Sequence, residues 1–123
     1  MRLLALDISK RKTGIAISDE ENKFIAYATE IKTSYHEFKK MLSSYKLSLT
    51  IIGLPIDFAG NHTNNTNFVK SFAHSIRDLI QPFIFVDERS TSNLAANILG
   101  TKDLDKKTAI MILYSHMYRK NIN

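Results

Sequence analysis

Four of the twelve acidic residues stand beside apolar segments, where a carboxylate is expensive to bury. Asp7 comes late in the apolar segment RLLALDI, Asp87 and Glu88 follow the run FIFV, and Asp105 opens an apolar helical segment. A carboxylate at the end of a buried strand is destabilised by desolvation unless a cation or hydrogen-bond donors compensate. Several such groups meeting at one edge of a sheet would suit Mg²⁺, which binds carboxylate oxygens, phosphate oxygens and water.

Two chemical interpretations of these acids remain open from spacing alone. Two cations about 4 Å apart could activate a water and stabilise the leaving oxygen in phosphodiester cleavage. Alternatively, each acid has a structural use: Asp7 bonds neighbouring backbone or Arg89, Asp87 pairs with Arg89, and Asp105 caps a helix. Any single acid fits the structural explanation. The three positions together, beside basic residues, favour a metal-dependent nuclease.

The charge balance indicates which partner such a site would have. Lys and Arg number 17 against 12 acidic residues, a net charge of +5, which favours a polyanionic partner without identifying it. Lys10, Arg11 and Lys12 follow Asp7 and could hold phosphates by charge, or could form a solvated turn. The chain has no cysteine, which excludes disulfides, Cys-zinc sites and thiol nucleophiles.

The elements that must position these residues can be predicted from hydrophobic periodicity. The length of 123 residues predicts a single domain, 1–123. Three strands joined by tight turns predict an antiparallel meander, and the strands and helices that alternate after it predict an α/β fold with a five-stranded mixed sheet flanked by helices. We expect strands at 2–8, 14–18, 24–29, 49–53 and 83–86, and helices at about 35–46, from the loop 57–66 to Pro82, at 91–99 and at 105–119.

The N-terminal segment bears on location. Its apolar run is interrupted by Asp7 and is too short for a signal sequence or a membrane span. We therefore expect a cytoplasmic protein that does not enter a membrane.

Four motifs, in this order, cover essentially the whole chain. They are Asp7-x-x-x-basic-basic-x-Gly14; Gly53-Leu54-Pro55 with Gly60; Asp87-Glu88-Arg89 followed by Thr91-Ser92; and Leu104-Asp105-x-x-x-Ala109. Together they resemble the YqgF/RuvX family, whose members are called Holliday-junction resolvases or pre-16S rRNA nucleases. The resemblance implies an RNase H-like fold related to the RuvC resolvases.

The resemblance also implies a site. Asp7, Glu88 and Asp105 would be the catalytic acids and would bind Mg²⁺ or Mn²⁺, with a two-metal site suspected. Neighbouring strand residues face opposite sides, so Asp87 and Glu88 are not both expected as ligands, and the resemblance selects Glu88. The expected substrate-binding residues are Lys10, Arg11, Lys12, Arg89 and Thr91, and the substrate is structured nucleic acid.

The chain departs from the usual family pattern at several positions near these residues. Ser9 replaces a usual glycine, which bears on how closely the backbone turn approaches a phosphate. The other departures are Asp57, Ser90, Lys106, Lys107 and Thr108. None of them removes one of the three acids, so we expect an intact site.

Three functions follow, from two classes. We expect a metal-dependent endonuclease, a hydrolase that processes the 5′ end of pre-16S rRNA. A Holliday-junction resolvase is the alternative within the class, but cutting two strands symmetrically needs a stable two-fold dimer. Met111, Tyr114 and Tyr118 could form an interface, and we expect a monomer or a weak homodimer. The alternative of another class is a non-catalytic, nucleic-acid-binding ribosome-assembly factor, whose binding would fall with salt and ignore Mg²⁺.

Overall fold

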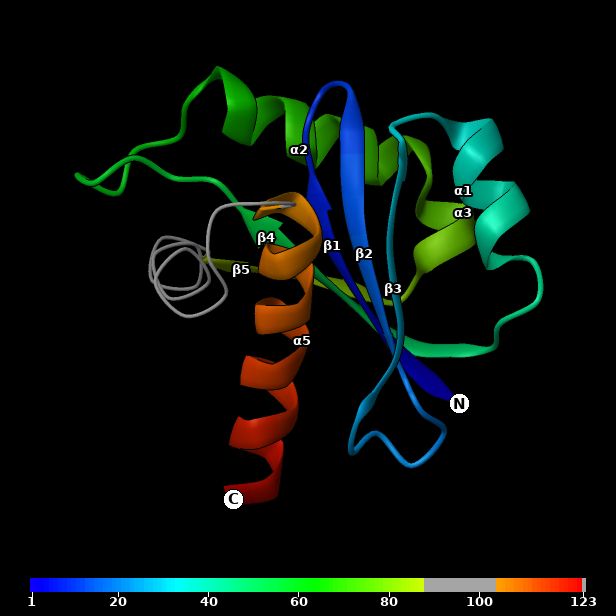
Figure 1. Cartoon of the computed structure of the whole chain (residues 1–123). Helices are drawn as coiled ribbons and strands as arrows, with labels where there is room; N and C mark the ends of the chain where they lie inside the picture. Colours follow the sequence, from blue (N-terminus) through cyan, green and yellow to red (C-terminus); the bar gives the residue numbers. More distant parts are fainter. Residues whose placement is uncertain (88–103, 123) are drawn as a thin grey trace.

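A five-stranded sheet with a helix layer on each face forms the centre of the computed structural model, which describes residues 1–87 and 104–122 (Figure 1). The strand order is β3-β2-β1-β4-β5. β2 pairs antiparallel with both β1 and β3, whereas β4 runs parallel to β1 and β5 runs parallel to β4. The predicted mixed sheet with an antiparallel meander is confirmed. The strands are β1 (Arg2–Ile8), β2 (Lys12–Ser18), β3 (Ile25–Lys32), β4 (Leu47–Leu54) and β5 (Phe83–Asp87).

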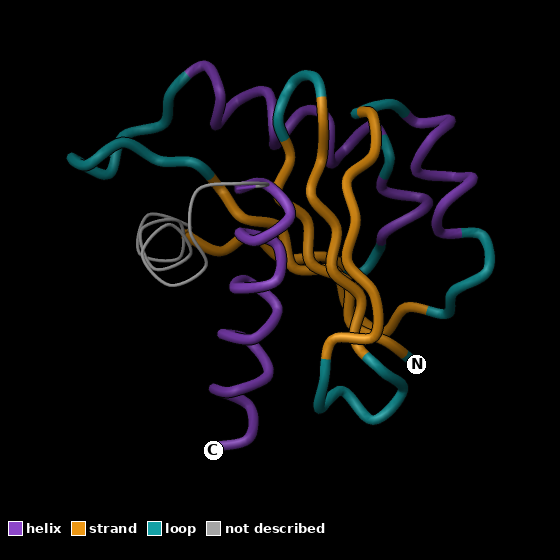
Figure 2. The backbone as a smooth tube through the Cα atoms, viewed as in Figure 1, coloured by secondary structure: helices purple, strands orange, loops and turns teal. Residues whose placement is uncertain are grey.

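The helices divide between the two faces (Figure 2). One face packs against α1 (Tyr35–Leu42), α2 (Asn64–Ser75) and α3 (Arg77–Ile80), and the other against α5 (Leu104–Ile122). Side chains of β1 point alternately to the two faces of the sheet. Leu4, Leu6 and Ile8 pack in the core beneath α1, α2 and α3, and Leu3 and Ala5 pack in the core beneath α5. The helix residues predicted to face inward from α5 are all buried, namely Ala109, Ile112, Leu113 and Met117.

Helix α1 begins where the sequence predicted and ends earlier. The Ser34 hydroxyl accepts a hydrogen bond from the Glu37 amide (3.2 Å), as expected of an N-cap. The helix stops at Leu42 rather than 46, since the chain must turn so that the Lys46 carbonyl accepts from the Arg2 amide (2.9 Å) beside β1. The Tyr35 hydroxyl donates to the Asp78 carboxylate (2.6 Å), which raises the pKa of Tyr35 and joins α1 to α3.

Other predicted boundaries also change. The helix expected to run to Pro82 is divided at Ile76, whose φ of −113° and ψ of 18° leave the helical region, so α2 and α3 are separate. The predicted helix 91–99 lies outside the described residues. β2 begins at Lys12 rather than Gly14, because the pairing continues to Ile8 and Thr13. Lys12 therefore belongs to a strand and not to the turn.

None of the helices in the described ranges combines the length and the apolar character needed to cross a lipid bilayer.

One buried polar atom generates a stability prediction. The Thr50 hydroxyl of β4 is fully buried and has no hydrogen-bond partner in the part of the chain that the structure describes. An unsatisfied buried hydroxyl costs about 1–3 kcal/mol. We expect Thr50→Val to raise the free energy of unfolding by about 1 kcal/mol, measured by urea denaturation. Thr50→Ser, which keeps the hydroxyl and removes a methyl group, is the control and should destabilise; a loss of stability in Thr50→Val would contradict the prediction.

Candidate active site

Asp7 lies near the carboxyl end of β1, on the sheet face that packs against α5. It alternates with Leu3 and Ala5, which belong to the α5 core, and it pairs in register with Gly14 of β2. Its side chain is half-buried. Because Gly14 has no side chain, the surface above that strand next to Asp7 is left open for the helix or a ligand to approach.

The register separates Asp87 from Asp7. Leu6 pairs with Ile52, so Asp7 aligns with Gly53, and Gly53 pairs in turn with Val86. Val86 packs in the α5 core, whereas Asp87 pairs with Leu54, a member of the opposite core. Asp87 therefore lies on the other face of the sheet from Asp7. The expectation that Asp87 does not share the site of Asp7 agrees with this geometry.

The start of α5 lies at the same end of the sheet as the β1–β2 hairpin (Figure 1). Asp105 is the second residue of this helix, one turn before buried Ala109, and its side chain lies outside the described residues. Glu88, Arg89 and Thr91 also lie outside them. The carboxylate of Asp7 is the type of hard oxygen donor that Mg²⁺ and Mn²⁺ prefer. Within residues 1–87 and the described part of α5, no three acids or histidines form a metal-binding group.

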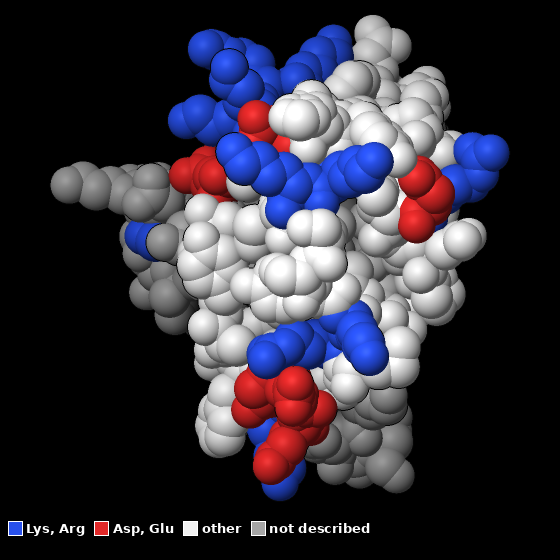
Figure 3. Space-filling model, turned by 90° about the vertical axis from the view of Figure 1, so that its right-hand side faces the viewer, with Lys and Arg blue, Asp and Glu red and all other residues white. Residues whose placement is uncertain are grey.

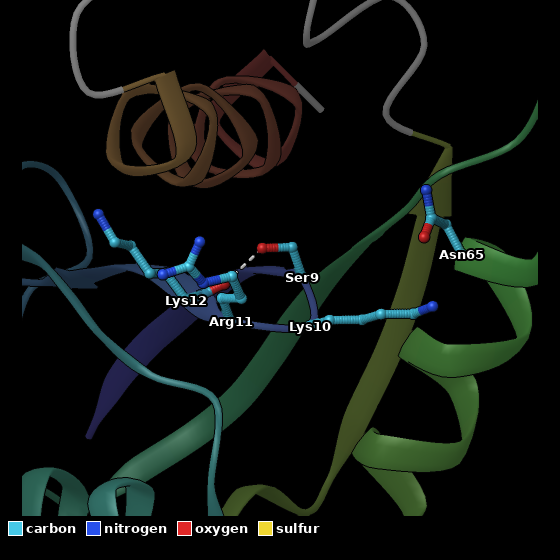
Figure 4. A pocket seen from close by; sticks show the side chains of 5 residues that line it. All are labelled: Ser9, Lys10, Arg11, Lys12 and Asn65. Carbon is cyan, nitrogen blue, oxygen red and sulfur yellow. Dashed lines mark hydrogen bonds between the residues drawn. The ribbon is translucent and has the colours of Figure 1, made fainter.

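Three of the predicted basic residues, Lys10, Arg11 and Lys12, line a pocket of about 410 Å³ at the tip of the hairpin. Figure 4 shows Lys10 extending toward α2, while Arg11 and Lys12 extend to the other side, beneath α5. Three basic residues and no acid line this pocket, a composition that suits a phosphate group. Its lining residues are Ser9, Lys10, Arg11, Lys12 and Asn65.

Asn65 is the residue of this pocket that the sequence did not indicate. It lies in the first turn of α2, whose N-cap Thr63 accepts from the Thr66 amide (3.2 Å). Its amide group can donate hydrogen bonds to a phosphate oxygen. The asparagine-rich composition of 61–67 was the available signal, but only the fold brings that segment to the hairpin.

Hydroxyl groups fix the shape of the basic hairpin. The Ser9 amide and hydroxyl both donate to the Lys12 carbonyl (3.1 and 2.7 Å). Thr33, which follows β3, donates through its hydroxyl to the Ser9 carbonyl (2.6 Å) and through its amide to the Arg11 carbonyl (3.1 Å). The buried Thr13 hydroxyl lies 2.8 Å from that of Thr33. Ser9, in place of the family's usual glycine, thus closes the turn internally.

The loop after β4 carries a large apolar side chain at its tip. Phe58 is 93% exposed. Asp57 shapes the loop: its carboxylate accepts from the Asn61 amide (2.7 Å) and its carbonyl from the Gly60 amide (2.9 Å), with Gly60 at a φ of 86° that favours glycine. The loop leaves β4 at the edge where β1 also ends, and an exposed aromatic ring there is able to stack on an unpaired base.

Comparisons with known proteins identify the family of this chain. The family model RuvX, described as Holliday junction resolvase, matches residues 1–118. The chain belongs to the RuvX family. A protein of Mycoplasma mobile named "Putative pre-16S rRNA nuclease" is 35% identical over 92% of this chain and 89% of its own length, and one of Carboxydothermus hydrogenoformans with the same name is 29% identical over both full lengths.

The fold has a counterpart among solved structures. RuvC of T. thermophilus, solved in complex with a Holliday junction substrate, superposes with a TM-score of 0.62, covering 98% of this chain and 96% of that chain at 13% identity. The RNase H-like fold and the family resemblance predicted from the sequence are confirmed. The expected class of enzyme, a nuclease, is the one that the family and the names of the relatives describe.

The contacts of Thr33 predict how the hairpin responds to its loss. Thr33→Val removes the hydroxyl that contacts Ser9 and Thr13 while keeping the shape of the side chain. We expect the free energy of unfolding to fall by about 1–2 kcal/mol and the Ser9 amide to exchange its hydrogen faster, because the hairpin loses the hydroxyl contacts of residue 33 and keeps only its backbone bonds to this segment. Thr33→Ser keeps the hydroxyl and should behave like the wild type. Equal exchange rates in both variants would show that these contacts do not hold the hairpin.

Proposed function

We propose that this protein is a metal-dependent nuclease that hydrolyses phosphodiester bonds in structured nucleic acid, and that its substrate is the 5′ end of pre-16S rRNA. The observation that carries the proposal is the position of Asp7. Its half-buried carboxylate lies on the α5 face at the end of β1, directly before the hairpin whose three basic residues line a pocket. A cation-binding acid beside a phosphate-binding surface is what phosphodiester hydrolysis needs.

We assign the metal ligands to Asp7, Glu88 and Asp105. Supporting this are the face of Asp7, the exclusion of Asp87 from that face, and the start of α5 at the same end of the sheet. Bound Mg²⁺ or Mn²⁺ would polarise the phosphate and lower the pKa of a water. The chain's own contribution is to hold the substrate: Lys10, Arg11 and Lys12 neutralise phosphates, and we assign Arg89 and Thr91 to the same task.

The choice of RNA over a branched DNA rests on the relatives named for pre-16S rRNA. A resolvase would need a stable two-fold dimer. On the outer side of α5, Met111 is half-buried and Tyr114 and Tyr118 are 43% and 68% exposed, so these residues are accessible to a partner. A monomer or weak homodimer, and a cytoplasmic location, stay predictions.

Metal binding at Asp7 has a readout that does not depend on cleavage. In wild-type protein we expect Mn²⁺ to raise the melting temperature relative to EDTA, because binding at a hundredfold excess over Kd adds about 2.7 kcal/mol to the free energy of unfolding. Asp7→Asn removes the charge at nearly constant shape, so it should fold and lose this metal-dependent stabilisation. Cleavage of labelled 16S precursor RNA and of a four-way DNA junction should be lost in the same variant. A variant that binds Mn²⁺ and cleaves normally would disprove the role of Asp7.

The two acids at the end of β5 provide a matched pair of variants. We expect Glu88→Gln to lower the rate of cleavage on the order of 100-fold or more, because a group that stabilises charge in the reaction is lost. Asp87→Asn carries the same loss of charge one residue earlier, on the face of the sheet away from Asp7, and should cleave within a few-fold of the wild type. If Asp87→Asn is the inactive one, the assignment of the ligands is wrong. If neither variant nor the wild type cleaves but all bind with salt sensitivity, the protein is a non-catalytic binder.

A further inference from the structure

Lys12, which lines the pocket, has a basic neighbour on the α5 face that does not line it. Lys12 of β2 and Lys32 of β3 are register partners, so they project from the same face of the sheet. Both side chains are exposed. Like charges directly opposite each other on two strands are destabilising. An anion held between two such lysines would convert this repulsion into attraction.

The neighbouring acid does not neutralise the pair. Glu30 lies two residues before Lys32, on the same face and opposite Gly14. In the described part of the chain, neither Lys12 nor Lys32 forms an ion pair with it or with any other carboxylate. The acidic turn between β2 and β3, with Asp19, lies at the far end of both strands. Figure 3 shows basic side chains gathered toward one end of this side of the molecule with acidic side chains beside them, and an acidic group next to further basic side chains at the other end.

Hydrogen bonds fix the backbone that carries Lys10, Lys12 and Lys32. Lys10 extends toward α2 and Asn65, whereas Lys12 extends to the opposite side of the hairpin (Figure 4). Thr33 directly follows Lys32 and bonds to the hairpin backbone at Ser9 and Arg11, so the end of β3 and the hairpin cannot shift independently. Because the backbone that carries both lysines is already fixed, binding a polyanion restricts only their exposed side chains.

We propose that Lys12 and Lys32 form a second phosphate-binding arm, on the side of the hairpin away from α2. This arm holds the backbone of the nucleic acid beyond the segment that contacts Lys10 and Asn65. It rests on the proposed function for the class of ligand, nucleic acid, but not on cleavage. A ligand that engages both arms must be long enough to cross the hairpin, so the contribution of Lys32 depends on the length of the ligand.

The test is binding in EDTA, where no metal-dependent cleavage interferes, measured by fluorescence anisotropy of labelled RNA at several salt concentrations. With an RNA of about 20 nucleotides, Lys32→Gln should weaken binding several-fold and reduce the slope of log K against log salt by about 1. With an RNA of about 6 nucleotides, measured at low salt, Lys32→Gln should bind like the wild type. Lys10→Gln should weaken binding of both lengths.

Two further variants separate a phosphate contact from a general effect of charge. Lys32→Arg keeps the charge and should restore the affinity. Lys46→Gln removes one exposed charge at the opposite end of β1 and should leave the slope unchanged. Equal effects of Lys32→Gln and Lys46→Gln, or an equal effect of Lys32→Gln on both lengths, would overturn the proposal.

The outcome for the arm is distinguishable from the outcome for the nuclease. If the length-dependent effect of Lys32 appears but the wild type cleaves no RNA or DNA with Mg²⁺ or Mn²⁺, the arm stands and the nuclease proposal is wrong. If cleavage occurs and Lys32→Gln has no effect at either length, the nuclease stands and the arm is wrong.

Discussion

The parallel pairing of β1 with β4, and of β4 with β5, is the constraint on which the proposed site depends. It brings the carboxyl ends of three strands to one edge, so that Asp7, the loop after β4 and the end of β5 meet there. The period of two along each strand then decides which side chains share a face. A slip of one residue in β1 would turn Asp7 toward α1 and α2 and expose Leu4 and Leu6 to the wrong layer. Two cores on two faces thus enforce the register that positions one carboxylate.

The site also depends on keeping its basic hairpin in place without acids. Salt bridges could fix the basic side chains near Asp7. A carboxylate partner would, however, neutralise the positive charge that binds a phosphate. The chain uses neutral groups for this purpose: the hydroxyls of Thr13 and Thr33 bond to each other, and those of Ser9 and Thr33 donate to backbone carbonyls. The basic side chains themselves stay exposed. The hydroxyl groups therefore fix the backbone of the hairpin, while the basic side chains of the same hairpin stay exposed to a ligand.

The sequence predicted those features that depend on local periodicity. The inward face of α5, the Ser34 cap and the strand at 2–8 with Asp7 near its end are confirmed in the structure. Features that depend on contacts between residues far apart in the chain could not be predicted from local sequence. The early end of α1 depends on a backbone bond to Arg2, and the start of β2 at Lys12 depends on pairing with β1.

The same limit applied to the site. Nothing in the local sequence around Lys32 or Asn65 places either residue beside the hairpin. One is brought there by strand register and the other by the packing of α2, and both arise only when the sheet is complete. The face on which Asp87 lies was equally non-local, because the pairing of β5 with β4 sets it, whereas the choice of Glu88 came from the family resemblance.

The carboxylate of Asp7 distinguishes a nuclease from a protein that only binds nucleic acid. A fixed negative charge beside a phosphate-binding surface repels the ligand, and the repulsion is stronger for a half-buried group, which solvent screens less. A simple binder would gain affinity from an uncharged residue at this position. A divalent cation reverses the sign of the interaction, since it is attracted to the acid and attracts the phosphate in turn. Under the proposed function, a cation between Asp7 and the substrate would give the acid at the end of β1 a favourable interaction with both.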